Sequence, residues 1–171
     1  MGLFDLFKGK NAEAPIPEEV TFPVTLEAVS TGKYVTMSQV PDEVFSTGVL
    51  GVCCGIDPEE GRVYAPISGK VIQLADTLHA IGIEAGGIEL LIHVGIDTVE
   101  MNGEGFCAAV KEGQYVKKGD LLLTMDLDKI HAAGHPATVI MAITNSDDFT
   151  AVESVAASAV HPGDGVLWVS K

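Results

Sequence analysis

The hydrophobic positions of this chain fall in short runs separated by Gly, Pro, Asp and Asn, a pattern typical of β-strands joined by turns. In residues 89–96, for example, Leu90, Ile92, Val94 and Ile96 alternate with Glu89, Leu91, His93 and Gly95. The expected strands cover residues 22–29, 34–37, 49–54, 63–65, 70–74, 138–143 and 165–170, and a turn followed by a strand covers residues 116–125. This spacing predicts an all-β fold, an antiparallel β-sandwich or barrel.

A few short helices are expected between the strands. Residues 41–45 predict a turn or a single helical turn, residues 106–112 one or two helical turns, and residues 146–156 a short helix. Asp126 or Asp128 can cap a further short helix that follows them. Two segments, residues 28–33 and 65–70, share an Ala-x-x-[Ser/Thr]-Gly-Lys pattern. This suggests two similar strand–turn–strand units.

The first 20 residues have a different character. Leu3, Phe4 and Phe7 would share one face of a helix, and lysines follow them. Such a segment predicts weak membrane association through residues 1–10, with a frayed terminus or packing on the core as the alternatives. Residues 11–19, rich in Ala, Pro and Glu, predict a linker. The chain therefore divides into a tail and linker over residues 1–20 and a single domain over residues 21–171.

Composition and charge restrict the classes of partner. The chain has 171 residues and a net charge of −14, which excludes nucleic acid as an expected partner. No apolar run is long enough to span a bilayer. The cysteines Cys53, Cys54 and Cys107 form neither a disulfide framework nor a metal knuckle, and core packing in a reducing compartment is expected.

Two histidines belong to one predicted hairpin, whose strands flank Gly86-Gly87. A two-residue Gly86-Gly87 loop would pair His93 with Ala80 and turn His79 to the other face. A three-residue loop that includes Ala85 would place His79 opposite His93, and a bulge could also bring them together. The sequence leaves the register open.

Two facing neutral imidazoles, bordered by Leu91 and Val94, allow two kinds of chemistry. One ring nitrogen could attack a phosphoryl group while the second histidine binds a phosphate oxygen. Alternatively, His79 and His93 could bind zinc, but two ligands leave a tetrahedral site incomplete until a partner supplies the others. Phosphoryl transfer through a histidine would require no cofactor.

A family resemblance favours phosphoryl transfer. The run His93-Val-Gly-Ile-Asp-Thr-Val-Glu100, followed by Gly103-Glu-Gly-Phe106, resembles the signature around the phosphorylated histidine of glucose-type enzyme IIA proteins of the bacterial phosphoenolpyruvate:sugar phosphotransferase system. Further similar motifs are Val40-Pro-Asp-Glu-Val-Phe45, Ala65-Pro-Ile-Ser-Gly69, the run Thr77-x-His79-Ala80, Glu112-Gly-Gln-x-Val-Lys117 and Gly119-Asp120. The opening Met-Gly-Leu-Phe-Asp resembles the membrane-associating tail of free-standing members. Leu78 departs from the family, in which Asn is common at this position.

The resemblance implies a β-sandwich of the duplicated hybrid motif type and a role for each site residue. His93 would be the phosphoacceptor, His79 would stabilise phospho-His93, and Thr77 would hydrogen-bond within the site. Asp42 and Asp97 would pair with arginines of partner proteins. An apolar rim would dock those partners, made of Phe45, Val49, Leu50, Leu91, Val94 and Val99.

The resemblance also implies partners and a location. The donor would be the histidine phosphocarrier protein, and the acceptor would be the IIB domain of a glucose-type permease. The protein would act in the cytoplasm, with a peripheral position at the inner face of the membrane where the tail binds. Regulatory targets would be further partners. Alternatives from other classes are a zinc-binding or regulatory protein on the same fold, a zinc hydrolase, and a lipoyl- or biotinyl-type carrier, for which the chain has no convincing acceptor lysine.

Overall fold

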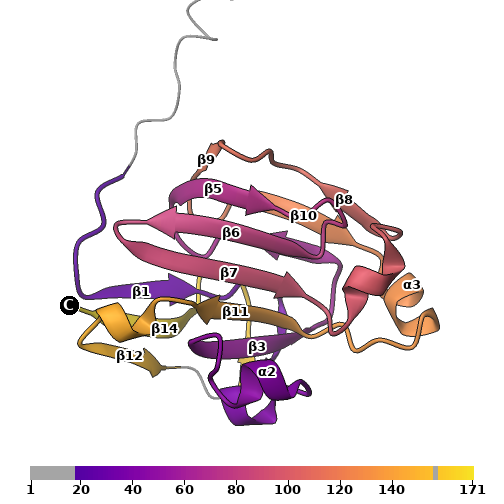
Figure 1. The fold of residues 1–171 in the computed structure, drawn as a ribbon, viewed down its shortest axis with the longest axis horizontal. Coiled ribbons are helices and arrows are strands. Elements are labelled where there is room, and N and C mark those ends of the chain that lie inside the picture. The colour runs from indigo at the N-terminus through magenta and orange to yellow at the C-terminus, as the bar shows by residue number, and fades with distance from the viewer. Residues whose placement is uncertain (1–17, 156–157) are drawn as a thin grey trace, which may run out of the picture.

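The computed structural model describes residues 18–155 and 158–171, and these residues form an antiparallel β structure with short helices (Figure 1). The strands are β1 (Val24–Glu27), β2 (Gly32–Val35), β3 (Val52–Pro58), β4 (Arg62–Tyr64), β5 (Gly69–Leu74), β6 (Ala80–Ala85), β7 (Ile88–Val94), β8 (Phe106–Ala108), β9 (Tyr115–Val116), β10 (Leu121–Met125), β11 (Val139–Ile143), β12 (Ala151–Ser154), β13 (Ala159–Val160) and β14 (Gly165–Ser170). The helical segments are η1 (Met37–Gln39), α2 (Glu43–Ser46), η2 (Thr98–Met101), α3 (Leu127–Ala132) and η3 (Ser146–Asp148). The predicted all-β class is confirmed.

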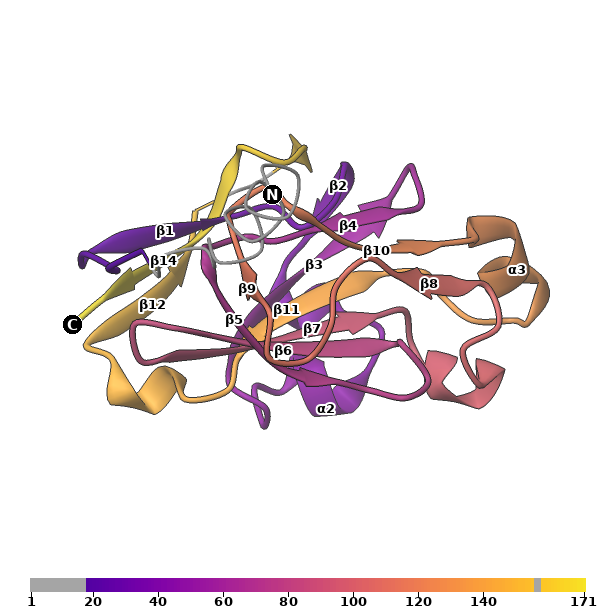
Figure 2. The same cartoon turned by 90° about the horizontal axis from the view of Figure 1, so that it is seen from above.

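The strands form one large sheet and two small ones. The large sheet has the order β13-β2-β3-β11-β7-β6-β5-β9, and the small sheets have the orders β1-β14-β12 and β4-β10-β8. Seen from above, the β1-β14-β12 sheet lies at one end of the molecule, and β8, β10 and α3 lie toward the other (Figure 2). Every strand pair of these residues is antiparallel.

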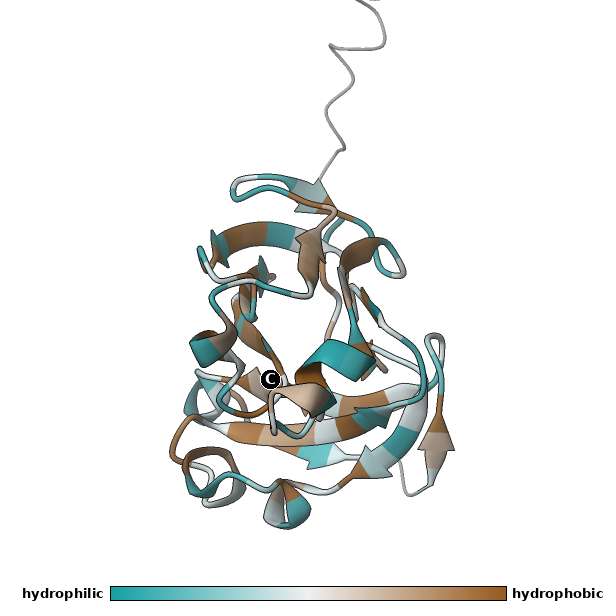
Figure 3. Cartoon of the chain, turned by 90° about the vertical axis from the view of Figure 1, so that its right-hand side faces the viewer, coloured by the Kyte–Doolittle hydropathy of each residue, from teal (hydrophilic) through white to brown (hydrophobic). Residues whose placement is uncertain are grey.

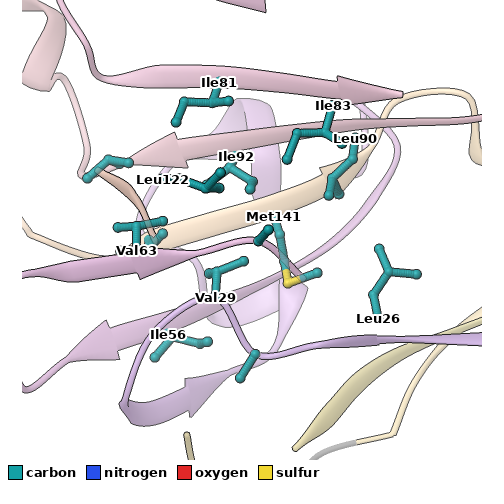
Figure 4. Close-up of a cluster of buried hydrophobic side chains, with 14 of the residues drawn as sticks. Leu26, Val29, Ile56, Val63, Ile81, Ile83, Leu90, Ile92, Leu122 and Met141 are labelled. Carbon is teal, nitrogen blue, oxygen red and sulfur yellow. The ribbon is translucent and has the colours of Figure 1, made fainter. Parts of the chain in front are cut away.

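Two hydrophobic clusters lie on opposite faces of the large sheet. The main cluster fills the interior with side chains from both the large and the small sheets, among them Leu26, Ile81, Ile92, Leu122 and Met141 (Figure 4). The smaller cluster lies where η1 and α2 cover the outer face, and it includes Phe45 and Ile140. Apolar and polar segments alternate along the strands because successive side chains face opposite sides (Figure 3).

Strand β11 shows how the two clusters meet. All five of its residues are buried because β11 lies between β3 and β7 in the large sheet and contributes to both clusters. Met141 points to the main cluster, whereas Ile140 and Ala142 belong to the smaller one. A continuous apolar run is therefore required here, as the buried-type strand predicted over residues 138–143 implies.

Several local predictions are confirmed, and two are wrong. Helix α2 occurs within the predicted turn region, and Asp126 caps α3 by accepting a hydrogen bond from the Lys129 amide. Residues 106–112 are not helical, because β8 pairs with β10. The helix predicted over residues 146–156 is restricted to η3, because residues 151–154 form β12 and pair with β14. Tertiary strand pairing overrides the local helical signals at both places.

The two segments that share the Ala-x-x-[Ser/Thr]-Gly-Lys pattern occupy similar positions. Gly32 begins β2 and Gly69 begins β5, and each strand pairs with the next long strand of the large sheet. The two segments also lie side by side, since Tyr64 donates its amide to the Val29 carbonyl and Glu27 donates to the Pro66 carbonyl. The predicted similarity of the two units is confirmed in this respect.

The predicted tail over residues 1–10 lies outside the described residues, as does most of the linker. Residues 18–20 are described, and Val20 packs against the main cluster beside Gly86 of the β6–β7 turn. Within residues 18–155 and 158–171, no helix has the length and apolar character needed to cross a membrane. Cys53 and Cys54 are buried as expected, but Cys107 is exposed.

Candidate functional site

The candidate site lies where β6 begins and β7 ends, at the same end of these two neighbouring strands of the large sheet (Figure 1). His93 is the penultimate residue of β7, and His79 immediately precedes β6. Their ring centroids are 5.1 Å apart, with an angle of 80° between the ring planes. The structure therefore brings together the two histidines that the sequence singled out.

The hairpin has the register of the two-residue loop, which in a regular strand would place the two histidines on opposite faces. Ala85 pairs with Ile88 across a two-residue Gly86-Gly87 loop, and His93 pairs with Ala80. A regular strand would then place His79 on the face opposite to His93. The rings nevertheless meet, because β6 begins only at Ala80 and His79 lies before it, outside the regular strand. The preceding residue, Leu78, has a left-handed φ of 58°. The Val94 amide still donates to the His79 carbonyl at 2.7 Å, so the two strands stay joined there.

The side chain of His93 has a defined tautomer. Its Nδ1 lies 2.8 Å from the carbonyl oxygen of Gly95, two residues farther along the chain. A carbonyl oxygen can only accept, so Nδ1 must carry the proton and donate it. In the neutral ring, Nε2 is then the unprotonated nitrogen with a free lone pair. Gly95 has a φ of 79°, which turns its carbonyl back toward the ring.

His79 is oriented by Thr77, whose Oγ1 lies 2.5 Å from His79 Nδ1. A hydroxyl group can either donate to a ring nitrogen or accept from it, so the contact can form with either tautomer of His79. In both cases it holds the orientation of the ring. The sequence-predicted residues Thr77, His79 and His93 thus form one continuous arrangement. The short distance between Thr77 and His79 results from the tight turn that joins β5 to β6.

Burial lowers the pKa of both histidines below the ordinary value of 6.5. For His93, burial is the main cause, while the Gly95 hydrogen bond and the charges of Asp42 and Asp97 act in the opposite direction. For His79, burial acts first and the neighbouring His93 second. Both rings are therefore mainly neutral at neutral pH, the form in which an imidazole nitrogen can act as a nucleophile.

Phe45 packs against the His93 ring from the smaller hydrophobic cluster. Its ring centroid lies 5.1 Å from that of His93 at an angle of 57° between the planes. Phe45 is only 4% exposed and belongs to the smaller hydrophobic cluster, in which the partly exposed Leu50 and Leu91 pack against it. Phe45 therefore holds the His93 ring and adds little to an open surface.

The rest of the expected rim divides into exposed and buried residues. Val49 is 74% exposed in the loop after α2, and Val99 is 47% exposed in η2. Val94 is fully buried in the main cluster, so its assignment to the rim is wrong. The reason is the strand alternation, which puts Val94 on the face opposite to its neighbour His93.

The two carboxylates of the site lie at the starts of the flanking helical segments. Asp42 caps α2, and its side chain accepts a hydrogen bond from the Val44 amide at 2.8 Å. Asp97 is exposed, has a φ of 58°, and precedes η2. Both charges act on His93, which makes the surroundings of the ring acidic.

Sequence reasoning did not identify the main-chain part of the site. The Gly95 carbonyl is the hydrogen-bond partner of His93, and no side-chain pattern reveals the role of a carbonyl. The amide of Gly95 donates to the Thr138 carbonyl at 2.9 Å, and that of Ile96 donates to the Pro136 carbonyl at 3.0 Å. A glycine two residues after a candidate histidine was the only available signal.

Metal binding has less support from the geometry. Among the described residues, no group of three or more His, Cys, Asp and Glu side chains is arranged to hold a metal ion. His79 and His93 could supply two ligands of a zinc ion, and a partner would have to supply the rest. A nucleophilic role needs no group beyond those already in place.

The chain resembles known proteins in both sequence and structure. The model of the family described as phosphoenolpyruvate-dependent sugar phosphotransferase system, EIIA 1, matches residues 24–149. The glucose-specific EIIA component of Halalkalibacterium halodurans is 39% identical over 166 residues, which cover 96% of this chain and 94% of the relative. The glucose permease IIA of Mycoplasma capricolum has a similar structure, with a TM-score of 0.78 and 32% identity, covering 86% of this chain and 96% of that one.

Some relatives are much longer than this chain. The β-glucoside-specific EIIBCA component of Dickeya chrysanthemi is 46% identical over 137 residues, which cover 80% of this chain but 22% of the relative. This chain thus corresponds to about a fifth of such proteins. The family match, the near full-length relative and the similar structure agree, and the chain belongs to the EIIA 1 family of the phosphoenolpyruvate-dependent sugar phosphotransferase system.

Proposed function

We propose that the protein carries phosphoryl groups for sugar uptake by forming a phosphohistidine at Nε2 of His93. The observation that carries this proposal is the hydrogen bond from His93 Nδ1 to the Gly95 carbonyl, which leaves Nε2 as the nucleophilic nitrogen. Family membership supplies the reaction, and the tautomer supplies the atom. The donor is the histidine phosphocarrier protein, and the acceptor is the IIB domain of a glucose-type permease.

The transfer needs little covalent chemistry from the protein. The Nε2 lone pair attacks the phosphorus of the donor's phosphohistidine, a new P–N bond forms, and the donor's P–N bond breaks with its electron pair returning to the donor ring. His93 keeps its Nδ1 proton and acquires positive charge as the bond forms. The Gly95 carbonyl and the carboxylates of Asp42 and Asp97 favour that charge, so catalysis rests mainly on position and electrostatics.

His79 binds the phosphoryl group after transfer. In this proposal the Thr77 hydroxyl, which lies 2.5 Å from His79 Nδ1, is the donor of that hydrogen bond. The proton of the neutral His79 ring is then on Nε2, which can donate to a phosphate oxygen. The 5.1 Å separation of the two ring centroids is short enough for both to contact one phosphoryl group. Thr77 is therefore a positioning residue for His79.

The surface around the histidines suits docking of a basic partner. Val49 and Val99 are exposed apolar side chains, and Leu50 and Leu91 are partly exposed. The acidic residues Asp42 and Asp97 can pair with arginine of a partner, which helps to orient it and speeds association. Apolar contacts then exclude water from the phosphoryl group during transfer.

The relatives also suggest where transfer leads. The long relatives are EIIBCA and EIICBA components, in which a region similar to this chain is joined to EIIB and EIIC. A separate IIB domain is therefore a reasonable acceptor. The proposal places the protein in the cytoplasm, with residues 1–10 providing weak contact with the inner face of the membrane. It requires no cofactor, and zinc would enter only at an interface with a regulatory partner.

The test is phosphorylation by the purified pathway. The protein is incubated with phosphoenolpyruvate, enzyme I and the histidine phosphocarrier, and its intact mass is then measured. We expect one acid-labile phosphoryl group on the wild type and none on His93→Ala. His131→Ala is the matched control, because His131 is exposed on α3 and should leave phosphorylation unchanged. Phosphorylation of the His93 variant, or none of the wild type by active partners, would contradict the proposal.

The role of His79 is tested separately. His79→Gln should still accept a phosphoryl group but pass it more slowly to a IIB domain. The glutamine amide can still donate a hydrogen bond, but phospho-His93 loses the imidazole ring whose orientation Thr77 holds. Onward transfer is followed as the decay of the phosphorylated protein after IIB is added. An unchanged decay rate would remove His79 from the mechanism while leaving His93 in place.

A further inference from the structure

Thr98 is a buried polar residue that the proposed transfer does not use. It is the first residue of η2, and its side chain is 0% exposed. Its hydroxyl donates to the carbonyl of Val94, the residue that follows His93. Its methyl group lies against Gly95, where a Cβ atom would come within 2.4 Å of Thr98 Cγ2. Thr98 therefore contacts both residues that follow the histidine.

These contacts hold two consecutive peptide groups. In the peptide between Val94 and Gly95, the carbonyl accepts from Thr98, and the amide donates to the Thr138 carbonyl at 2.9 Å. In the next peptide, the Gly95 carbonyl accepts from His93 Nδ1, and its Ile96 amide donates to Pro136 at 3.0 Å. Because the peptides on both sides of Gly95 are held, the φ and ψ of Gly95 between them are restricted, and the Thr98 contacts hold the first of the two peptides.

The consequence concerns the tautomer of His93. Gly95 has a φ of 79°, and glycine has more accessible backbone conformations than any other residue type. Its carbonyl therefore needs external contacts to stay directed at the ring nitrogen of His93. If that carbonyl moves, Nδ1 loses its acceptor, and the proton can reside on either nitrogen. Nε2 would then be unprotonated for only part of the time.

We propose that Thr98 is a positioning residue, which acts through Gly95 to keep the proton of His93 on Nδ1 and the lone pair on Nε2. The hydroxyl supplies the hydrogen bond, and the methyl group fills the space beside Gly95. The catalytic consequence rests on the proposed role of His93, whereas the effect on the tautomer does not. The two parts can therefore fail separately.

The experiment compares Thr98→Val, which keeps the shape and loses the hydroxyl, with Thr98→Ser, which keeps the hydroxyl. Ser30→Ala is the matched control for a purely structural effect. Ser30 is also 0% exposed, and its hydroxyl also donates to a main-chain carbonyl, that of Arg62, at 2.9 Å. All four proteins are studied as full chains, under conditions in which each is shown to be folded by its dispersed amide NMR spectrum.

The first readout is the ¹⁵N NMR spectrum of the histidine rings in the unphosphorylated protein. The wild type, Thr98→Ser and Ser30→Ala should show His93 protonated on Nδ1, whereas Thr98→Val should show a mixture of tautomers. The second readout is the rate of phosphoryl acceptance. It should fall roughly 10- to 100-fold in Thr98→Val and stay within about three-fold in the other variants, as expected when a reacting group is slightly misplaced.

Each outcome decides the proposal. A folded Thr98→Val that keeps the wild-type tautomer would overturn it, whatever the rate. Equal rate losses in Thr98→Val and Ser30→Ala would also overturn it, because they would indicate a loss of stability alone. If the wild type is not phosphorylated at all, the proposed function fails, but the tautomer comparison still decides whether Thr98 positions His93.

Discussion

Replacement of Gly95 by alanine tests the geometry of the site most directly. An alanine there would keep a φ of 79°, for which an L-residue costs about 1–2 kcal/mol. Its Cβ would also lie 2.4 Å from Thr98 Cγ2 and 3.2 Å from the Pro136 carbonyl oxygen. Thr98 is fully buried and cannot turn away, so overpacking should cost about 1–3 kcal/mol more. Together these terms predict a loss of about 2–5 kcal/mol in the free energy of unfolding.

Gly87 provides a control that separates the two costs. Its φ is 91°, but a Cβ atom placed on it would have no atom within 4 Å. Gly87→Ala should therefore lose only the backbone part, about 1–2 kcal/mol. Equilibrium urea denaturation of both variants and the wild type gives the two losses, provided that the m-values stay constant.

The comparison has a clear refuting result. Equal losses for Gly95→Ala and Gly87→Ala would show that the contact between Thr98 and Gly95 is not as tight as described. Gly95→Ala should also slow phosphoryl acceptance beyond the effect of its unfolded fraction, because the carbonyl that fixes the His93 tautomer moves. Gly87→Ala, when folded, should accept phosphoryl groups at the wild-type rate.

Three further predictions concern pH, the left-handed turn and the docking surface. Because the pKa of His93 lies below 6.5 when folded, the unfolded state binds more protons between that lowered pKa and 6.5. The urea midpoint of the wild type should therefore fall as the pH falls through this window, more steeply than that of His93→Gln; parallel curves would contradict the pKa shift. Leu78→Val should destabilise the protein by roughly 2 kcal/mol in urea denaturation, because a β-branched residue resists a φ of 58°. Leu78→Asn should stay within about 1 kcal/mol of the wild type, because Asn tolerates this conformation, and similar losses for the two variants would refute this. Val49→Asn should raise the KM for the phosphocarrier several-fold without changing the free energy of unfolding. Val155→Asn, at a position 52% exposed next to β12, should change neither quantity, and equal effects of the two variants on KM would remove Val49 from the docking surface.

The sequence by itself determined the features that depend on local chemistry. Strand alternation placed His93 on the face away from Ile92, and the prediction that Asp126 or Asp128 caps a short helix was confirmed at Asp126. Both signals act within a few residues. The ordered motifs around His93 and His79 identified the family without any knowledge of the register. The continuous apolar run of β11 likewise reports a strand buried on both faces.

Only the tertiary structure decided how the site is assembled. The hairpin register would have separated the histidines if the strand had continued regularly, but β6 begins only after His79. The turn before it contains Leu78 in a left-handed conformation, for which leucine has no local preference. The partner of His93 Nδ1 is a main-chain carbonyl, which every residue possesses and no side-chain pattern reveals. Residues 106–108 and 151–154 became strands because β10 and β14 offered them hydrogen-bonding edges. Such long-range pairing contributes more than local propensity, and for that reason it was beyond the reach of the sequence pattern.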